Sequence, residues 1–488
     1  MGVTKSADTR REALLSRLKA IGQEHLIAFW NRLASAEQET LAGQIEGIDA
    51  ELFRKLQDEH RRQMTAGDDV GSKWAALAAQ AEPPHAMRLD GSGVSFSSDD
   101  ARDAGAAALK AGQVGMILVA GGLGTRLGFD QPKGMFPIGP LSGRSLFQVL
   151  IEQLLAVSRR HGARIPLCVM TSPATDAETR RFLRENQNFG LPDGDLAIFC
   201  QATMWAVSSD FSRILLESPG SLFLGPDGHG GMLSAFNRTG ALAEAERRGI
   251  KHLFYGQIDN PLLQVCDELL IGSHILAGSE MTTQVVPKRD PLERVGNVVQ
   301  IDGRAQVIEY SDLPEEFARQ RDMDGALYLW AGNLAIHVFD LAFLSRQARE
   351  PSALPFHVAK KKVACLDENG QLVEPQEPNA LRFERFIFDL LPRAERALVV
   401  EADPFDAFAP VKNSDDEPTD NPRLAKAAIL ALHRALLERA GIEVAAGVPV
   451  EINPLWASTE AEIRAKLPPG TYITEPTYLA PNGPRPVV

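Results

Sequence analysis

A glycine-rich segment between residues 120 and 134 holds the residues with the clearest chemical potential. Glycines let the backbone approach a ligand closely, and consecutive N–H groups in such a loop form a cradle for an anion. Arg126 and Lys133 add positive charge within the same few residues. This combination predicts a binding site for a triphosphate. The segment consists of Ala120, Gly121, Gly122, Leu123, Gly124, Thr125, Arg126, Leu127 and Gly128, followed closely by Pro132, Lys133 and Gly134.

The glycines alone do not establish this chemistry, because many glycine-rich turns after strands serve only to reverse the chain. A dinucleotide fingerprint GxGxxG fits poorly, since the glycines fall at Gly122, Gly124 and Gly128. A Walker A loop does not fit either, because no Gly-Lys-Ser/Thr follows the glycines. The added Thr-Arg-Leu-Gly and Pro-Lys-Gly sequences at this spacing make the pattern specific.

Asp259 is a candidate metal ligand. It follows the apolar run Leu253–Tyr255 and is expected at the carboxyl end of a strand, where ligands bind in parallel sheets. Mg²⁺ favours carboxylates combined with substrate phosphates. The alternative is that Asp259 caps the turn before Asn260 and Pro261, as aspartate often does. From the residue alone the two interpretations are equal.

Short apolar runs predict the strands that position these residues. Such runs, bounded by turn residues, are typical of buried parallel strands. Strands that alternate with helices predict an α/β domain with a mostly parallel sheet. The predicted strands are Met116–Ala120, Leu167–Met170, Ala197–Phe199 and Leu253–Tyr255, and the helices between them include Ser145–Arg159 and Ala241–Arg248.

The segment before this domain, residues 1–104, predicts a helical region and a linker. Apolar residues recur three and four apart along Leu14–Ile21, Leu26–Leu33 and Leu41–Ile48, which is typical of helices. The stretch Ala81–Asp100 loses this spacing and is rich in Pro, Gly, Ser and Asp. We therefore expect a linker packed on the surface there.

The remaining chain predicts a catalytic domain at residues 105–400 and a small C-terminal domain at residues 401–488. Within the catalytic domain, Met281–Tyr310 favours antiparallel strands with a hairpin turn at Asp302-Gly303. The C-terminal part begins with a polar break and continues with a helix near Leu424–Ala440.

The composition restricts the class of protein. Among the 488 residues, 64 acidic and 51 basic side chains give a net charge of −13. This argues against a nucleic-acid binder, because such proteins carry a basic face. Four scattered cysteines without a CxxC pair favour a reduced cytoplasm over a zinc site or a disulfide framework. The charged first residues do not predict a signal peptide, and no apolar run predicts a membrane span.

The sequence GGLGTRLG…PKG resembles the signature loop of sugar-nucleotide pyrophosphorylases. The chain more narrowly resembles the eukaryotic-type UDP-N-acetylhexosamine pyrophosphorylases, within the wider group that includes UDP-glucose pyrophosphorylase. The resemblance implies a Rossmann-like, GT-A-like nucleotidyltransferase domain of α/β class with an N-terminal helical region and a small C-terminal domain. Further segments that match in order are His25–Asn31, Pro226–Gly231, Ile258–Asn260, Val307–Tyr310, Ala331–Asn333, Pro378–Asn379 and Pro410–Asn413.

The resemblance implies that a sugar 1-phosphate attacks the α-phosphorus of UTP, which gives UDP-sugar and pyrophosphate with Mg²⁺ as cofactor. A phosphate nucleophile needs no general base, and the sequence has no clear Ser-His-Asp or Cys-His arrangement. Positioning and charge neutralisation then supply most of the catalysis. The implied roles are Arg126 on the departing pyrophosphate, Lys133 on the triphosphate, Lys412 on the α- or sugar phosphate, and Asp259 on Mg²⁺.

The same resemblance implies the substrate-binding residues. Without it, Gln201 and Lys412 would be taken as surface residues, Glu309 as a solvated strand position and Asn333 as a turn residue. A cluster at Lys360–Lys362 is a secondary candidate for phosphate contact. The implied set is Ala120, Gly121, Gly122, Gly124 and Thr125 on UTP, Gln201 on uracil, Gly228 and His229 on uracil and sugar, and Glu309 and Asn333 on the sugar.

Three other functions compete with this one. A UDP-glucose or broad UDP-sugar pyrophosphorylase would share the chemistry. A catalytically silent homologue that binds UDP-sugar would be free to lose Arg126, Lys133, Asp259 and Lys412, all of which are present. An NAD-dependent oxidoreductase would need an acidic residue about 20 positions after the loop, and Glu152 lies too far on.

His229 departs from the pattern of the N-acetylhexosamine branch, which usually has Gly-Asn-Gly-Gly at this loop. UDP-glucose relatives have Gly-His-Gly, usually followed by an acidic residue where this chain has Gly231. The loop is therefore a hybrid. The Ala331–Asn333 and Pro378–Asn379 segments favour N-acetylglucosamine 1-phosphate as the first substrate, with some use of glucose 1-phosphate.

Overall fold

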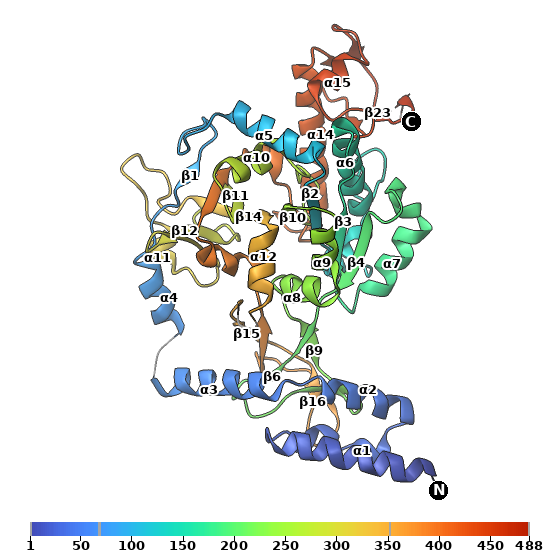
Figure 1. Cartoon of the computed structure of the whole chain (residues 1–488), viewed down its shortest axis with the longest axis vertical. Coiled ribbons are helices and arrows are strands. Elements are labelled where there is room, and N and C mark those ends of the chain that lie inside the picture. Colours follow the sequence, from blue (N-terminus) through green and yellow to red (C-terminus); the bar gives the residue numbers. More distant parts are fainter. Residues whose placement is uncertain (1, 67–69, 351–352, 487–488) are drawn as a thin grey trace. The chain divides into compact units, whose positions relative to one another are not determined.

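The structure is a computed structural model that describes residues 2–66, 70–350 and 353–486 (Figure 1). Contacts along the chain define two compact units. Unit 1 comprises Met1–Ala76, Ala202–Gly231 and Leu354–Phe386, and unit 2 comprises Leu77–Gln201, Met232–Ala353 and Ile387–Val488. The two units are defined by contacts within the structure. The domain ranges 1–104, 105–400 and 401–488 come from the sequence pattern and stay a prediction.

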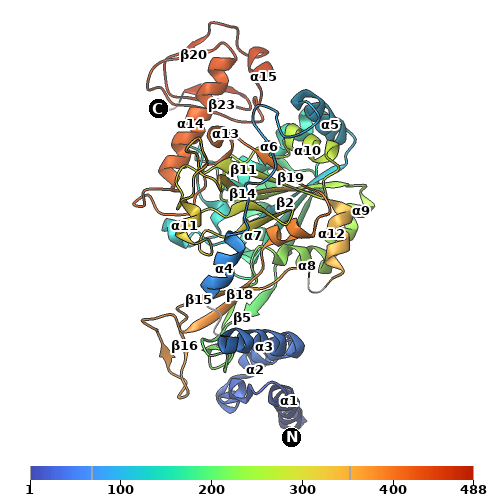
Figure 2. The ribbon, with the colours of Figure 1, turned by 90° about the vertical axis from the view of Figure 1, so that its left-hand side faces the viewer.

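Unit 2 is built on a mixed sheet of ten strands among the described residues (Figure 2). The neighbours β10, β2, β3 and β4 are parallel, as are β1, β19 and β11, while β14 lies antiparallel between β11 and β10. The α/β class is thereby confirmed. The path runs through β1 (Ala86–Met87), β19 (Ala397–Glu401), β11 (Met281–Pro287), β14 (Ala331–Asp340), β10 (His252–Gln257), β2 (Val114–Val119), β3 (Leu167–Thr171) and β4 (Leu196–Cys200).

Helices cover this sheet because the strands are apolar on both faces. In β2 and β3 nearly every residue is buried, which is why they appear in the sequence as continuous apolar runs. Helices α5 and α10 pack tightly against each other, since a Cβ on Gly105 or Gly272 would overlap the facing backbone. The helices of unit 2 include α5 (Ser98–Lys110), α6 (Leu146–His161), α7 (Asp176–Glu185), α9 (Ala241–Arg247), α10 (Glu268–Leu276), α12 (Leu341–Ala348) and α14 (Pro422–Arg439).

The predicted hairpin in unit 2 is confirmed. Strands β12 (Asn297–Ile301) and β13 (Arg304–Ile308) pair antiparallel, and Asp302 and Gly303 between them have φ angles of 50° and 75°. Positive φ at both central residues defines the tight turn that Asp-Gly favours.

One expectation about the first hundred residues is wrong, and a second is made more specific. Part of the predicted surface linker is an edge strand, because Ala86 and Met87 pair with β19 and are buried. The stretch Leu26–Leu33 is not an α-helix but two short 3₁₀ turns, η1 (Glu24–Ile27) and η2 (Trp30–Arg32). Spacing of three and four cannot separate these helix types over so short a run.

Unit 1 combines helices with small antiparallel sheets. Its core gathers apolar side chains of α1, α2 and α3 with those of β5, β6 and β18. No helix among the described residues of either unit is long and apolar enough to cross a membrane. The elements of unit 1 include α1 (Gly2–Lys19), α2 (Ser35–Glu46), α3 (Ala50–Ala66), β5 (Thr203–Trp205), β6 (Val207–Ser208), β7 (Leu216–Ser218), β8 (Ser221–Leu222), β9 (Leu224–Pro226), β15 (His357–Lys361), β16 (Cys365–Leu366), β17 (Leu372–Val373) and β18 (Ala380–Glu384).

The C-terminal segment of unit 2 is joined to the main sheet by a buried ionic network. Arg144 donates to Glu152 at 2.6 Å and to Glu451 at 2.7 Å, and Glu451 also accepts from the backbone N–H groups of Leu141 and Ser142. Burial alone would raise the pKa of Glu451, but Arg144 and these hydrogen bonds outweigh it and lower the pKa. The segment comprises α14, β20 (Glu443–Val444), β21 (Val450–Ile452), α15 (Glu460–Arg464), β22 (Tyr472–Ile473), β23 (Thr477–Ala480) and β24 (Gly483–Pro486).

Replacing Glu451 should destabilise the protein in a pH-dependent way. At pH 7, Glu451→Gln should lower the free energy of unfolding by about 3 kcal/mol, because one partner of a buried charge pair is removed. Since folding lowers the pKa, the contribution is complete above the ordinary value of 4.5 and declines as pH falls below it. Urea unfolding at several pH values measures this. A loss equal to that of the exposed control Glu443→Gln, or one that does not shrink in acid, would contradict it.

Candidate functional site

The hydrogen-bond register between β2 and β10 sets the geometry of the candidate site. The strands are parallel, with Val119 opposite Gln257, and the N–H of Ile258 donates to the Val119 carbonyl at 3.0 Å. Both strands therefore end at one edge of the sheet. The glycine-rich loop leaves β2 at this edge, and Asp259 leaves β10 beside it.

The glycine-rich loop folds back on itself. The N–H of Lys133 donates to the Gly122 carbonyl at 3.0 Å, and the N–H of Gly124 donates to the Gln131 carbonyl at 2.8 Å. A Cβ at Gly124 would approach the Phe129 carbonyl to 2.7 Å, so this position requires glycine. At Gly122, by contrast, a Cβ would meet no atom within 4 Å, which leaves open space beside the backbone.

Lys133 and Asp259 meet at this edge. Lys133 Nζ lies 3.8 Å from Asp259 Oδ2, and each side chain is 16% exposed. No group of three or more possible metal-ligating side chains occurs in the part of the chain that the structure describes. A hard cation held here would thus have Asp259 as its protein carboxylate and draw further oxygens from substrate phosphates and water, which suits Mg²⁺.

Residues 407–413, called the Lys412 segment below, are hydrogen-bonded to the loop of Asp259, although 153 positions separate Lys412 from Asp259. The N–H of Val411 donates to the Asp259 carbonyl at 2.8 Å, and the Asn260 amide bonds the Ala407 carbonyl at 2.7 Å. Lys412 itself lies over the Phe408 ring, with Nζ 5.9 Å from its centre. The structure therefore brings Lys412 into the neighbourhood of Asp259.

Asp420 was not predicted from the sequence but belongs to this neighbourhood. Its carbonyl accepts the N–H groups of Lys412 and Asn413 at 2.7 and 3.0 Å. Burial raises the pKa of its carboxyl, and the charge of Lys412 opposes that rise. In the sequence the polar stretch 413–420 is typical of an ordinary loop, so nothing in it predicted a role for Asp420.

Gln201 lies against the glycine-rich loop. A Cβ at Gly121 would be 3.0 Å from the Gln201 amide nitrogen, and Gln201 itself is buried at the end of β4. Its Oε1 has no hydrogen-bond partner among the described residues. A buried amide oxygen without a partner is costly and commonly marks a site for a ligand donor. An amide both donates and accepts, as a uracil edge requires.

Glu309 and Asn333 surround Gly296. A Cβ at Gly296 would lie 2.9 Å from Glu309 Oε1 and 3.7 Å from the Asn333 Cβ. Next to Asn333, β14 bulges against β11, and Asn333 Oδ1 accepts the N–H of Ala335 at 3.0 Å. The predicted pair is thus brought together around a glycine that the sequence analysis missed. A glycine just before a strand gave only a weak signal.

The other loop residues differ in exposure. Ala120 is buried, and its N–H donates to the Met170 carbonyl at 2.8 Å. Thr125 and Arg126 are exposed, and Arg126 forms no ion pair within residues 2–66, 70–350 and 353–486. Arg126 therefore presents a charge that a phosphate can neutralise.

Gly228 and His229 belong to unit 1. Gly228 has a φ of +83°, and a Cβ there would lie 2.4 Å from the Arg385 carbonyl oxygen, so the turn requires glycine. The His229 ring stacks on Phe386 with centroids 5.2 Å apart. Burial, together with nearby His357, lowers the pKa of His229 to about 4, so the ring is neutral near pH 7. Lys360 and Lys361 of the secondary cluster lie exposed on β15.

Together, a parallel-rich sheet, a glycine-rich loop at its carboxyl edge, and converging lysine and aspartate side chains define a nucleotide-binding α/β protein of the nucleotidyltransferase type. The profile of the UTP–glucose-1-phosphate uridylyltransferase family matches residues 79–441. The chain belongs to this family.

Individual relatives carry a narrower name. The chain is 36% identical to the human UDP-N-acetylhexosamine pyrophosphorylase-like protein 1, over 87% of this chain and 85% of the relative. It is 34% identical to the UDP-N-acetylglucosamine pyrophosphorylase of Saccharomyces cerevisiae, over 88% and 92% of the two chains. Its fold matches the crystal structure of the Trypanosoma brucei UDP-N-acetylglucosamine pyrophosphorylase with a TM-score of 0.79 and 26% identity, over 96% and 98%.

Arg126→Ala and Lys133→Ala should each lower turnover by about 100-fold or more, because one preorganised charge contact in the transition state is worth roughly 3–4 kcal/mol. Pyrophosphate release measures turnover, and circular dichroism checks the fold. The exposed Arg159→Ala in α6 serves as the control. Near-native turnover in either variant would remove that residue from the catalytic set.

Proposed function

We propose that this chain transfers the uridylyl group of UTP to N-acetylglucosamine 1-phosphate and releases pyrophosphate. The observation that carries the proposal is the meeting of the glycine-rich loop, Lys133, Asp259 and the Lys412 segment at one sheet edge. The names of the human and yeast relatives support the choice of sugar. The buried, unpartnered Oε1 of Gln201 beside Gly121 supports a uracil base at the same edge.

The reaction requires charge neutralisation more than proton transfer. The sugar phosphate oxygen is already anionic near pH 7, so it can attack the α-phosphorus without a general base. The bond to the leaving pyrophosphate breaks as the new P–O bond forms in line with it. The protein must therefore bring two anionic substrates together and hold them in this geometry.

Three cationic side chains neutralise different parts of the substrates. Lys133 lies 3.8 Å from Asp259 and is positioned for the triphosphate, while exposed Arg126 binds the departing pyrophosphate. Lys412 binds the α- or sugar phosphate from a segment that is tied to Asp259 by the Val411 N–H. When bound, Mg²⁺ supplies further positive charge to the phosphate oxygens, with Asp259 as its protein ligand.

The reaction should depend on a divalent cation held by Asp259. Chelation should abolish pyrophosphate release, and Mg²⁺ alone should restore it. Asp259→Asn should weaken binding of Mn²⁺, used as a paramagnetic substitute, by at least tenfold in the presence of UTP, because the carboxylate charge is lost. Electron paramagnetic resonance measures the free Mn²⁺. Full activity in chelator, or unchanged Mn²⁺ binding, would exclude this role; Asp416→Asn, an exposed carboxylate, is the control.

The sugar is tested by pyrophosphate release from UTP with a panel of sugar 1-phosphates. N-acetylglucosamine 1-phosphate should give the highest kcat/KM, with measurable use of glucose 1-phosphate. His229→Asn should change the ratio of the two values by about 5- to 100-fold, since one group in a pocket is commonly worth about 1–3 kcal/mol. A higher kcat/KM for glucose 1-phosphate in the native enzyme would overturn the proposed sugar. An unchanged ratio in His229→Asn would show that His229 does not select it.

A further inference from the structure

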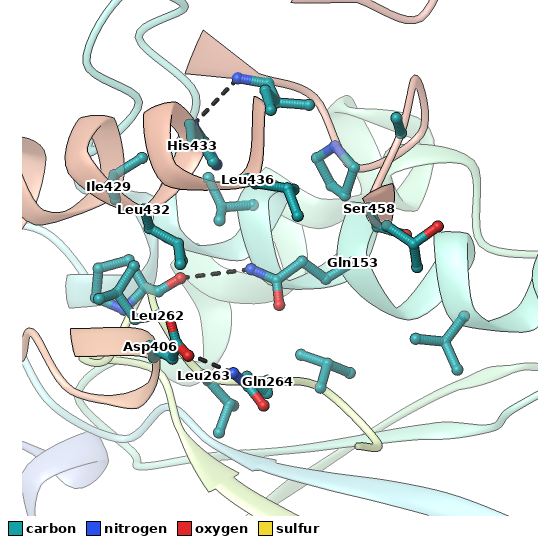
Figure 3. Close-up of a pocket in the computed structure, with 18 of the residues that line it drawn as sticks. Gln153, Leu262, Leu263, Gln264, Asp406, Ile429, Leu432, His433, Leu436 and Ser458 are labelled. Atoms are coloured by element: carbon teal, nitrogen blue, oxygen red, sulfur yellow. Dashed lines mark hydrogen bonds between the residues drawn. The ribbon is translucent and has the colours of Figure 1, made fainter. Parts of the chain in front are cut away.

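A cavity of about 400 Å³ lies within unit 2 (Figure 3). Its walls come from α6, α14, the loop after β10 and the chain after β21. None of the candidate catalytic, metal or substrate-binding residues is among the described residues that line it. The cavity is therefore a separate feature from the candidate active site.

Part of the cavity wall is apolar, and the rest is polar or charged. Figure 3 shows Ile429, Leu432 and Leu436 extending from one helix on one side, with Leu262 and Leu263 on the other. Leu262, Leu263 and Ile429 are buried in the main core, so this part of the wall is rigidly packed. A volume of this size, in which an apolar wall is combined with polar and charged groups, suits a small organic molecule that has both an apolar and a polar part.

The arginines around the cavity are engaged with carboxylates. Arg144 pairs with Glu451 and Glu152, Arg160 lies 3.1 Å from Glu268, and Arg439 lies 3.0 Å from Glu460. The charge of Arg102 acts on Asp267, where it opposes the rise in pKa that burial causes. Because these cations already face acidic partners, the cavity is poorly suited to a phosphate or a second nucleotide.

Asp406 and His433 are two further polar groups at the cavity, and the charge of Arg439 acts on the Asp406 carboxylate. Asp406 Oδ1 is buried and has no hydrogen-bond partner within residues 2–66, 70–350 and 353–486. His433 Nδ1 accepts the N–H of Ile452 at 3.1 Å, so the neutral ring carries its proton on Nε2. Asp406 is half-buried, and its buried Oδ1 is the atom that a ligand donor would satisfy, since a buried acceptor without a hydrogen bond is costly.

We propose that this cavity is a second small-molecule site, which takes a compact ligand with an apolar ring and a cationic, multiply N–H-donating head group that binds Asp406. Amidinium and guanidinium groups fit this description, because two parallel N–H groups match a carboxylate. The assignment rests on the cavity and does not depend on the identity of the sugar substrate.

The chain from Asp406 to Val411 connects this cavity with the predicted active site. Asp406 borders the cavity and is followed by Ala407, whose carbonyl accepts from the Asn260 side chain at 2.7 Å. Further along, the Val411 N–H binds the Asp259 carbonyl. A ligand that binds Asp406 therefore acts on the segment that carries Lys412. Occupancy can change substrate affinity if the ligand prefers one position of that segment.

Benzamidine is a suitable probe, because it joins a phenyl ring to an amidinium group. Isothermal titration of the full chain should show one site for benzamidine, and inorganic phosphate should not compete for it. Asp406→Asn should weaken binding at least tenfold, whereas Asp193→Asn, an exposed carboxylate outside the cavity, should not. Leu432→Trp, which fills the cavity with a larger ring, should abolish binding and provides a second test if Asp406→Asn fails to fold.

The assignment would be overturned if benzamidine did not bind the native chain. It would also be overturned if Asp406→Asn and Leu432→Trp bound benzamidine as tightly as the native chain does. The connection to the active site has its own readout. Saturating benzamidine should change the KM for UTP at least twofold in the native chain and leave it unchanged in Asp406→Asn. Binding without any change in KM or kcat would refute that connection. The binding result is independent of the sugar panel, because benzamidine binding is measured without a sugar phosphate. The KM measurement uses whichever sugar 1-phosphate the chain accepts.

Discussion

The parallel hydrogen-bond register between β2 and β10 is the constraint on which the candidate site depends. It places the ends of the two strands side by side, so that the glycine-rich loop and Asp259 leave the sheet together. Lys133 then reaches Asp259 only because Gly134 permits close packing, since a Cβ there would lie 2.2 Å from the Phe147 ring. A shift of one residue in this register would turn the strand side chains to the opposite face and separate these groups.

An acidic protein that binds phosphates must overcome electrostatic repulsion. A net charge of −13 would repel anionic substrates on average. Cations are instead concentrated at one edge, where Lys133 comes from the loop and Lys412 from a distant segment that the Val411 N–H joins to the Asp259 carbonyl. The backbone N–H of Lys412 is held by the Asp420 carbonyl, so the position of this residue is fixed through the backbone.

The C-terminal segment, which follows Lys412 and begins with α14, is anchored by a buried ionic pair. The Arg144–Glu451 pair is buried and connects this segment to the loop before α6. Such a pair adds little net stability but penalises any arrangement that separates its members. Arg144 and Glu451 also line the cavity, and the Asn260–Ala407 hydrogen bond joins the chain before Lys412 to the sheet edge.

The sequence by itself determined the α/β class, the buried strands and the Asp302-Gly303 turn, because apolar runs and turn chemistry are local properties. It also identified the glycine-rich loop and, through resemblance, proposed roles for Lys133, Asp259 and Lys412. The tertiary structure alone decided that Ala86-Met87 is an edge strand, since two residues carry no periodicity and owe their conformation to pairing with β19. It alone placed Gly296 between Glu309 and Asn333, and Asp420 beside Lys412, because these contacts join segments whose pairing no local pattern encodes.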